Sequence, residues 1–429
     1  MSRCLLRSKV SVAALTGALL TIGATSDRAL AQGQGGRSVT LDVSERLSAS
    51  RNRSLTPGGD NREVISTTSL GFALDSRTNV DRLGFTATTA LRGTFGDNAE
   101  DFEFADPVLR FGYSRQGSGS DVSFAVETTS SDISYLRPYE LVLNEEDGTI
   151  EVVSDFDDLT GTGTRRQSRL TASGNWGKQA RLGFGATLNL RDLSYQNVTS
   201  DSLNDSQSLN ASTSARFAIT PILNAGASLS YGRTDRDGGT STETRGYGLS
   251  LTARGSRGQV GADFGATQTD TGGHRYSLSG SWSESLASGG QLALSLGTAW
   301  TVSGDAALTA RANFTKTLPT GQIGAQLRRG VTDNADGDEI LSTAGLVNYT
   351  HRIDRLSQVG MNFSYTGSSN LSEDTDTRQT ELSASYSRQL AQNWTAQIGA
   401  SRTWRDDDGD TADSDSLFLQ FGRSFSAPF

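Results

Sequence analysis

The sequence predicts an all-β fold, a transmembrane antiparallel up-and-down β-barrel of about 20 strands, with about 18 to 22 as the range. Three observations support this fold class. Apolar and polar residues alternate from Val39 to the end of the chain, short and long connectors follow one another between the alternating segments, and no apolar stretch after Ala24 is long enough for a membrane-spanning helix. The composition agrees, because 48 glycines and many Ser, Thr, Asn and Asp residues favour strands and turns over helices.

The N-terminus has the pattern of a secretory signal peptide, which we expect to be residues 1–31. Basic residues precede an apolar span from Val10 to Ala24, and Ala31 ends a small-residue cleavage site. Cleavage leaves residues 32–37 as a short periplasmic N-terminal segment and removes Cys4, the only cysteine. The mature chain then has no thiol for a disulfide, a nucleophile or a thiolate metal site.

The alternating segments are long enough to cross a membrane as strands. Alternation over ~10 residues is what a strand needs when one face meets an apolar medium and the other meets water. An even number of strands returns the chain to the side on which it started, and we expect residues 38–429 to form the whole barrel. Clear examples are Val39–Ala49, Thr68–Leu74, Leu182–Leu190, Leu292–Trp300 and Val359–Tyr365.

The connectors indicate two different rims. Short turns occur near Asp75, Gln116, Gly177, Thr220 and Thr317. Between them lie longer and acidic connectors, which we expect to be extracellular loops; a three-residue connector near Ser303 is the exception. These expected loops are residues 95–107, 131–164, 333–339, 366–378 and 405–416.

Trp and Tyr residues predict the two membrane interfaces, because amphipathic rings favour the ends of lipid-facing strands. They share the apolar parity of their strands. We expect Tyr113, Trp176, Trp282, Tyr349, Tyr386 and Trp394 near the short-turn rim, and Tyr231, Tyr247, Tyr276, Trp300 and Tyr365 near the long-loop rim.

Two water-soluble β folds are the alternatives to the barrel. A sandwich alternates too, but it needs larger core residues and a more charged outer face than this sequence supplies. A β-helix needs a fixed short repeat, which the sequence lacks. The barrel is therefore the predicted architecture.

The last strand resembles the C-terminal strand of Gram-negative outer-membrane proteins, in which a terminal Phe follows apolar residues at every second position. Arg423 and Pro428 depart from that pattern. Over residues 38–429 the chain is similar to β-barrel porins of proteobacteria, and the resemblance implies an assembly signal at Phe421, Phe425 and Phe429 that the barrel-assembly machinery recognises. As a lipid-facing strand, this segment must pair with the first one, near Val39–Ala49. The matching apolar positions are Leu417, Leu419, Phe421, Phe425, Ala427 and Phe429.

The residues that alternate with the apolar ones along each strand, which have the opposite parity, should face the barrel interior. Their side chains are small and polar and leave room for water. Its charged residues are mostly arginines, against the acids Asp42, Glu127, Asp263 and Glu381. A lumen of this kind favours anions. The alternative is that the arginines pair with neighbouring or loop carboxylates. The candidate pore-lining residues are Arg46, Arg82, Arg92, Arg110, Arg169, Arg181, Arg216, Arg254, Arg275, Arg311 and Arg328.

The third long connector, residues 131–164, contains two alternating runs around an EEDG turn, which predicts a small hairpin. By position it resembles the third loop of trimeric porins, which folds inward and narrows the pore. Nothing in the connector determines its direction, so the sequence leaves open whether the hairpin enters the lumen or projects into the medium.

The sequence gives little support for catalysis or for a cofactor. The two histidines, His274 and His351, are expected at opposite rims, so neither is expected to have a catalytic partner. The acidic connectors lack the spacing and distal Glu of a twelve-residue calcium loop, and no metal site is predicted. The arginines are dispersed rather than clustered, which argues against nucleic-acid binding.

These patterns predict an outer-membrane channel for passive diffusion of small hydrophilic solutes, with both termini periplasmic. It would contact lipid, lipopolysaccharide and the barrel-assembly machinery, and homo-oligomerisation is left open. The alternatives are a structural or adhesive surface barrel and the outer-membrane component of polysaccharide or protein export.

Overall fold

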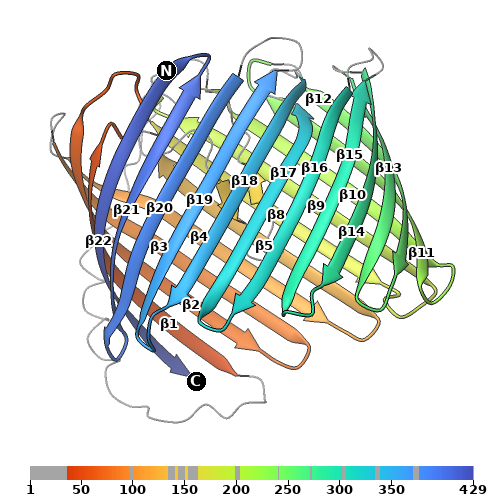
Figure 1. The fold of residues 1–429 in the computed structure, drawn as a ribbon, viewed down its shortest axis with the longest axis horizontal. Coiled ribbons are helices and arrows are strands. Elements are labelled where there is room, and N and C mark those ends of the chain that lie inside the picture. Colours follow the sequence, from red (N-terminus) through yellow and green to blue (C-terminus); the bar gives the residue numbers. More distant parts are fainter. Residues whose placement is uncertain are drawn as a thin grey trace, which may run out of the picture.

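The alternating segments form strands that join into one closed ring (Figure 1). In this computed structural model the expected signal peptide 1–31 and Phe429 lie outside the described residues. The structure describes residues 36–96, 101–133, 141–143, 150–152, 163–198, 203–239, 241–270, 273–301, 306–333, 339–370 and 376–428.

The described ranges contain 20 barrel strands and a separate two-stranded hairpin, β6–β7. No helix in these ranges is long and apolar enough to cross a membrane. The strands are β1 (Arg37–Arg51), β2 (Arg62–Arg77), β3 (Asp81–Gly96), β4 (Asp101–Gln116), β5 (Ser120–Asp132), β6 (Leu141–Leu143), β7 (Ile150–Val152), β8 (Thr164–Trp176), β9 (Leu182–Gln196), β10 (Ser206–Ala218), β11 (Leu223–Arg236), β12 (Thr242–Arg254), β13 (Gly258–Thr269), β14 (Gly273–Ser285), β15 (Gly290–Thr301), β16 (Ala306–Leu318), β17 (Gly321–Asp333), β18 (Glu339–Arg352), β19 (Ser357–Asn370), β20 (Asp376–Ala391), β21 (Trp394–Asp407) and β22 (Asp410–Pro428).

Each barrel strand pairs antiparallel with its neighbours in the ring, and β22 closes it against β1 from Ser38↔Pro428 to Arg51↔Asp415. The prediction of about 20 strands is confirmed. The predicted pairing of the last strand with the first is confirmed as well. Closure leaves no open edge, which a membrane-spanning sheet requires.

Side chains alternate between an outward apolar face and an inner polar face. On β22, the outward Leu417 is 55% exposed, whereas Ser414 on the other parity is 1% exposed. Because the large apolar side chains point away from the barrel, its outer wall suits a lipid environment.

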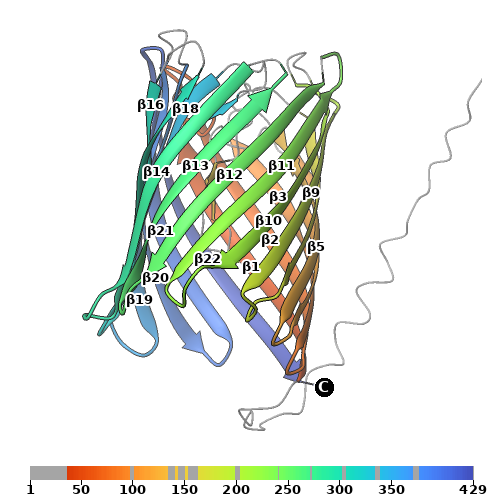
Figure 2. The same cartoon turned by 90° about the vertical axis from the view of Figure 1, so that its right-hand side faces the viewer.

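The two rims differ, as the connector lengths predicted. Figures 1 and 2 show compact turns at the lower rim, and both the start of β1 and the end of β22 lie at that rim. One such turn joins Leu318 of β16 to Gly321 of β17, which pair directly. The connectors at the upper rim are longer on the whole.

Several acidic segments expected as loops are instead strand. Residues 405–416 belong almost entirely to β21 and β22, which are joined by a two-residue turn at Asp408 and Gly409. Both turn residues have positive φ, 50° and 94°, as a type I′ hairpin requires. Most of 95–107 and 366–378 is also paired. The prediction of long loops here was wrong, because polar residues continue the strands beyond the apolar outer band.

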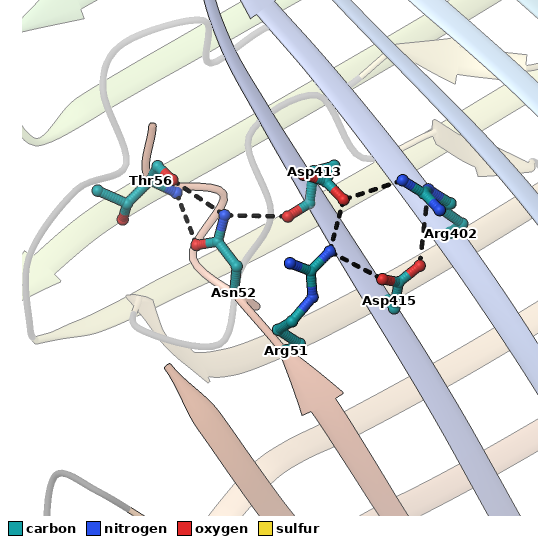
Figure 3. Close-up of polar contacts among 6 residues, drawn as sticks. All are labelled: Arg51, Asn52, Thr56, Arg402, Asp413 and Asp415. Carbon is teal, nitrogen blue, oxygen red and sulfur yellow. Dashed lines mark hydrogen bonds and ion pairs between the residues drawn. The ribbon is translucent and has the colours of Figure 1, made fainter. Parts of the chain in front are cut away.

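A polar cluster joins the first and last strands above that apolar band (Figure 3). Arg51 contacts Asp413 at 2.7 Å and Asp415 at 3.0 Å, and Arg402 of β21 lies 3.1 Å from Asp413. Asn52, only 2% exposed, donates from Nδ2 to the main-chain oxygens of Asp413 and Thr56, each at 2.9 Å. The β1–β2 connector is thereby attached to the last strand at the seam of the barrel.

The aromatic residues agree with the predicted rims where strand ends locate them. Trp176 is the last residue of β8 and Trp394 the first of β21, both at the short-turn rim. Near the other rim, Tyr276 and Trp300 are direct cross-strand partners with ring centroids 6.2 Å apart.

Candidate functional site

The inner face carries the candidate pore-lining arginines. Ten of the eleven predicted arginines lie in barrel strands on the inner parity; Arg181 instead precedes β9. Register decides which of them come together, because directly paired residues project from the same face of a sheet.

The first inner group is a cross-strand row on β4, β5, β8 and β9. Arg110 pairs with Glu127, Glu127 with Arg169, and Arg169 with Arg191. Arg110 and Glu127 form an ion pair of 2.9 Å. The row therefore contains three arginines and one carboxylate.

The second inner group is a pair of arginines on β16 and β17. Arg311 is the direct partner of Arg328, and their next neighbours along the row are Ser295 and Ala344. Like charges directly opposite each other destabilise a sheet. Within the described residues Arg311 makes no ion pair and is exposed on the inner face.

At least three of the predicted arginines are paired with acids of the described residues, as the alternative interpretation proposed. Arg110 is one of them, and Arg82 contacts Asp75 at 3.3 Å. Arg92 is the third: its side chain is 8% exposed and contacts Glu103 at 3.0 Å as well as Asp106. Arg92 is thus buried and does not line open water, contrary to expectation.

A bulge explains the burial of Arg92. The pairing of β3 with β4 shifts between Thr88 and Ala90, and Asp106 adopts a positive φ of 47°. An extra residue on one strand redirects its side chain. This bulge has no signal in the sequence, because alternation continues on both sides of it.

Two further predicted arginines lie at the short-turn rim. Arg181 donates from Nε to the main-chain oxygen of Ala218, and its guanidinium lies 4.9 Å from the ring centre of the outward Phe217. Arg181 is therefore not placed as a lumenal residue. Arg216 donates to the carbonyl oxygens of Gly177 and Lys178 and stabilises that turn.

The remaining candidates keep their predicted parity. Arg46 lies on the inner face with its guanidinium 3.9 Å from the ring centre of Phe418. Arg254 ends β12, and Arg275 lies near the start of β14.

Several arginines of the inner parity were missed, namely Arg191 and Arg165 and, at or near strand ends, Arg77, Arg236, Arg352 and Arg405. Arg191 and Arg165 both donate to Oε1 of Gln167, at 3.1 Å each. Arg191 follows Leu190 directly, so the alternation of β9 already assigns it to the inner face. Arg165 lies at the second position of β8, where the apolar pattern has not yet begun.

The third connector contains the predicted hairpin, and β7 lies against β18. Counted from β1, β8 is the sixth and β18 the sixteenth strand of the 20-stranded ring. The hairpin leaves the wall between β5 and β8 and reaches the opposite wall. It therefore crosses the barrel and does not project away from it.

The histidines lie at opposite rims, as predicted. His274 is the second residue of β14, and His351 is the next-to-last residue of β18. The ring of His351 stacks on Tyr349 with an interplanar angle of 18°, and its Nδ1 is 3.3 Å from Oγ1 of Thr320. In the described part of the chain no cluster of three metal-ligating side chains is found.

The predicted assembly-signal residues Phe421 and Phe425 point outward from β22, and Arg423 lies between them on the same face. The guanidinium of Arg423 lies 4.3 Å from the ring centre of Phe425 and 5.3 Å from that of Trp394. These contacts explain how a charge is accommodated in an apolar row.

No family model matches the chain, and no curated protein matches its sequence. Solved structures with a similar arrangement include OccK7 (OpdD) of Pseudomonas aeruginosa, with a TM-score of 0.40 and 10% identity over 91% of this chain and 99% of that one. OpdK of the same organism, crystallised with vanillate, gives 0.40 and 12% over 91% and 99%. The siderophore receptor PirA of P. aeruginosa gives 0.47 and 11% over 91% and 80%.

Proposed function

We propose that this barrel is an outer-membrane channel through which small hydrophilic solutes diffuse passively, with a preference for anions. The observation that carries the proposal is the arrangement of inner-face arginines in direct cross-strand pairs, Arg169 with Arg191 and Arg311 with Arg328. Such pairs cost stability, so a sheet that places them on its inner face is suited to attract negative charge.

The two pairs lie on different walls of the barrel. Arg169 and Arg191 belong to β8 and β9, the sixth and seventh strands of the ring, whereas Arg311 and Arg328 belong to the fourteenth and fifteenth. A solute that passes along the lumen is exposed to positive potential from both sides. The low-dielectric lipid around the wall strengthens this potential in the pore.

The β6–β7 hairpin supports a selective rather than a wide channel. It reaches β18 from the opposite wall and so divides the cross-section of the barrel. We infer that it narrows the path and that solutes pass beside it by size exclusion, with no chemical step catalysed by the protein.

Ion selectivity tests the proposal directly. The purified protein is inserted into a planar bilayer, and the reversal potential is measured in a salt gradient. We expect anion preference in the wild type and a shift toward cations in the double variant R311Q/R328Q. The shift should be larger at 0.1 M than at 1 M salt, because the screening length falls from about 10 to about 3 Å.

The variant R388Q is the matched control, because Arg388 is exposed on the outward parity of β20, near the short-turn rim. It removes a positive charge without changing the inner face, so its selectivity should equal that of the wild type. Cation preference in the wild type contradicts the proposal. A silent barrel would favour the adhesive or export role.

We also propose that the short-turn rim is periplasmic and that Phe421, Phe425 and Phe429 form the signal read by the barrel-assembly machinery. The outward position of Phe421 and Phe425 supports this role, since an unfolded chain would present both to a partner. Deletion of Phe429 should lower the amount of assembled barrel in the outer membrane; full assembly without it contradicts the signal.

A further inference from the structure

The outer wall of the barrel has an apolar hollow of about 500 Å³ over β9–β13. It results from one cross-strand row, in which Ala215 of β10 and Ala227 of β11 are direct partners. Large side chains flank this pair in the same row, Phe184 on one side and Leu249 followed by Phe264 on the other. Two adjacent small residues between large ones leave a depression about two strands, or roughly 10 Å, wide.

The hollow opens on the face that carries the outward apolar side chains. Leu249 is 60% exposed and Phe184 52% exposed at its edges. In a membrane this face meets hydrocarbon, and an unfilled hollow forfeits dispersion contacts along its lining. A lipid acyl chain has the width and the chemistry to fill it. A second barrel would present a convex wall, which does not enter a depression of this width.

Two arginines lie above the hollow on the strands that line it. Arg233 on β11 and Arg245 on β12 share the outward parity, and their direct partners are Glu243 and Tyr231. Leu229, at the edge of the hollow, is four residues from Arg233, or about 13 Å along an extended strand. That distance separates the upper part of an acyl chain from the headgroup of its lipid.

The side chains of both arginines are about half exposed, and each guanidinium has N–H groups that its carboxylate partner does not use. Arg233 contacts Asp235 at 2.9 Å, and Arg245 contacts Glu243 at 3.3 Å. A guanidinium has five N–H groups, so each can bind a phosphate while it keeps its carboxylate partner. The cluster therefore offers an anionic headgroup two cations from neighbouring strands.

We propose that the hollow, together with Arg233 and Arg245, binds one lipopolysaccharide molecule of the outer leaflet, with an acyl chain of its lipid A in the hollow and a phosphate at the arginines. The choice of lipopolysaccharide rests on the proposed outer-membrane location, which puts the long-loop rim in that leaflet. The lipid then attaches this wall to the surrounding leaflet at a defined place.

Native mass spectrometry of the full chain in detergent tests the site. The protein is incubated with diphosphorylated lipid A or with phosphatidylethanolamine, and the bound fraction is measured. Ala227→Phe fills the hollow, and R233Q/R245Q removes the headgroup contacts. We expect at least a tenfold loss of bound lipid A in each variant, and weaker binding of phosphatidylethanolamine to the wild type.

Two controls match these changes. Ala262→Phe adds the same volume on the outward face of β13 away from the lining, between Leu251 and Gly280, and R388Q removes an arginine at the other rim. Both should retain lipid A like the wild type. Heat-modifiable mobility on SDS gels shows that each variant is folded.

Three results would overturn the proposal. The first is that Ala227→Phe retains as much lipid A as the wild type, and the second is that the wild type retains both lipids equally. The third is that Ala227→Phe changes the oligomeric state while lipid binding is unchanged, which would make the hollow a contact between copies. Anion selectivity measured on the same preparation is independent of all three. Loss of the lipid site alone therefore leaves the proposed channel intact, and loss of selectivity alone leaves the lipid site intact.

Discussion

Asn52, the residue that follows the first strand, donates a 2.9 Å hydrogen bond to the main-chain oxygen of Asp413 in the last strand. The same amide group also donates to the carbonyl of Thr56 and accepts from its N–H, so one buried side chain organises the β1–β2 connector and attaches it to β22. The ends of the barrel sequence are therefore joined by side chains as well as by the strand ladder.

Asn52→Ala should destabilise the closed barrel. It removes the hydrogen bonds between the buried amide and the main chain of Thr56 and Asp413, each of which contributes about 0.5–1.5 kcal/mol to the free energy of unfolding. Urea unfolding followed by tryptophan fluorescence measures the change. Asn197→Ala is the control, because Asn197 also has a positive φ, 55° against 49°, but is exposed. Equal loss in both variants would assign the effect to backbone strain alone.

The stacking of Arg423 predicts coupling with Trp394. A double-mutant cycle of R423Q and W394L should give a coupling energy of about 0.5–2 kcal/mol, the range for a cation over an aromatic face. R423Q combined with W282L, on a different strand, should be additive within about 0.5 kcal/mol. Additivity in the first cycle would show that the geometry at Arg423 contributes no energy.

The burial of Arg92 predicts that its replacement destabilises the barrel more than replacement of an exposed arginine does. Arg92→Met removes the cation from Glu103 and Asp106, whose side chains are 29% and 38% exposed, so we expect a loss of about 1.5–3 kcal/mol in the free energy of unfolding, the contribution of hydrogen bonds to charged groups. Arg82→Met is the matched control: Arg82 is 61% exposed beside Asp75, and an exposed pair contributes about 0–1 kcal/mol. Similar urea midpoints for the two variants would contradict a structural role for Arg92.

The sequence predicted the barrel because alternation is a local property. Lipid on one side of the wall and water on the other impose a period of two on every strand, and the strand number and the pairing of the two end strands follow. Where strands extend beyond the lipid this constraint ends, and the Asp- and Ser-rich residues of β21 and β22 were mistaken for a loop. The contrast between Leu417 and Asp413, four residues apart on one outward face, marks that transition.

The candidate site was less predictable, because it depends on register. Parity identified the inner-face arginines, but only pairing shows that Arg311 faces Arg328 and that Arg110 faces Glu127. The bulge at Asp106, which buries Arg92, and the direction of the β6–β7 hairpin depend on tertiary contacts with no local signal.

The turn between β18 and β19 predicts a pH effect at the short-turn rim. The main-chain N–H of Leu356 donates to Asp354 at 2.7 Å, and this bond holds the pKa of Asp354 below its ordinary value. The stabilisation of the turn is therefore fully present above the unfolded pKa and is lost as the pH falls through the lower, folded pKa. Carboxyl ¹³C shifts should show a midpoint below the ordinary value. A midpoint at or above it would contradict the bond.

The β6–β7 hairpin gives the last prediction, a change in conductance. Because β7 lies against β18 on the opposite wall, the hairpin occupies part of the cross-section of the proposed channel. Deletion of residues 139–155 removes it and should raise the single-channel conductance in a planar bilayer. The barrel itself should persist, since β5 pairs with β8 from Asp132↔Thr164 onward and needs no residue of the hairpin for its ladder.

A deletion of residues 372–374, in the connector between β19 and β20, controls for shortening a connector at the same rim. It should leave the conductance near the wild-type value. If the hairpin deletion also leaves conductance unchanged while both proteins retain heat-modifiable mobility, the hairpin does not narrow the pore. A rise in conductance with lower anion selectivity would show, in addition, that the hairpin holds solutes close to the inner-face arginines, because field strength at a wall charge falls with distance from it.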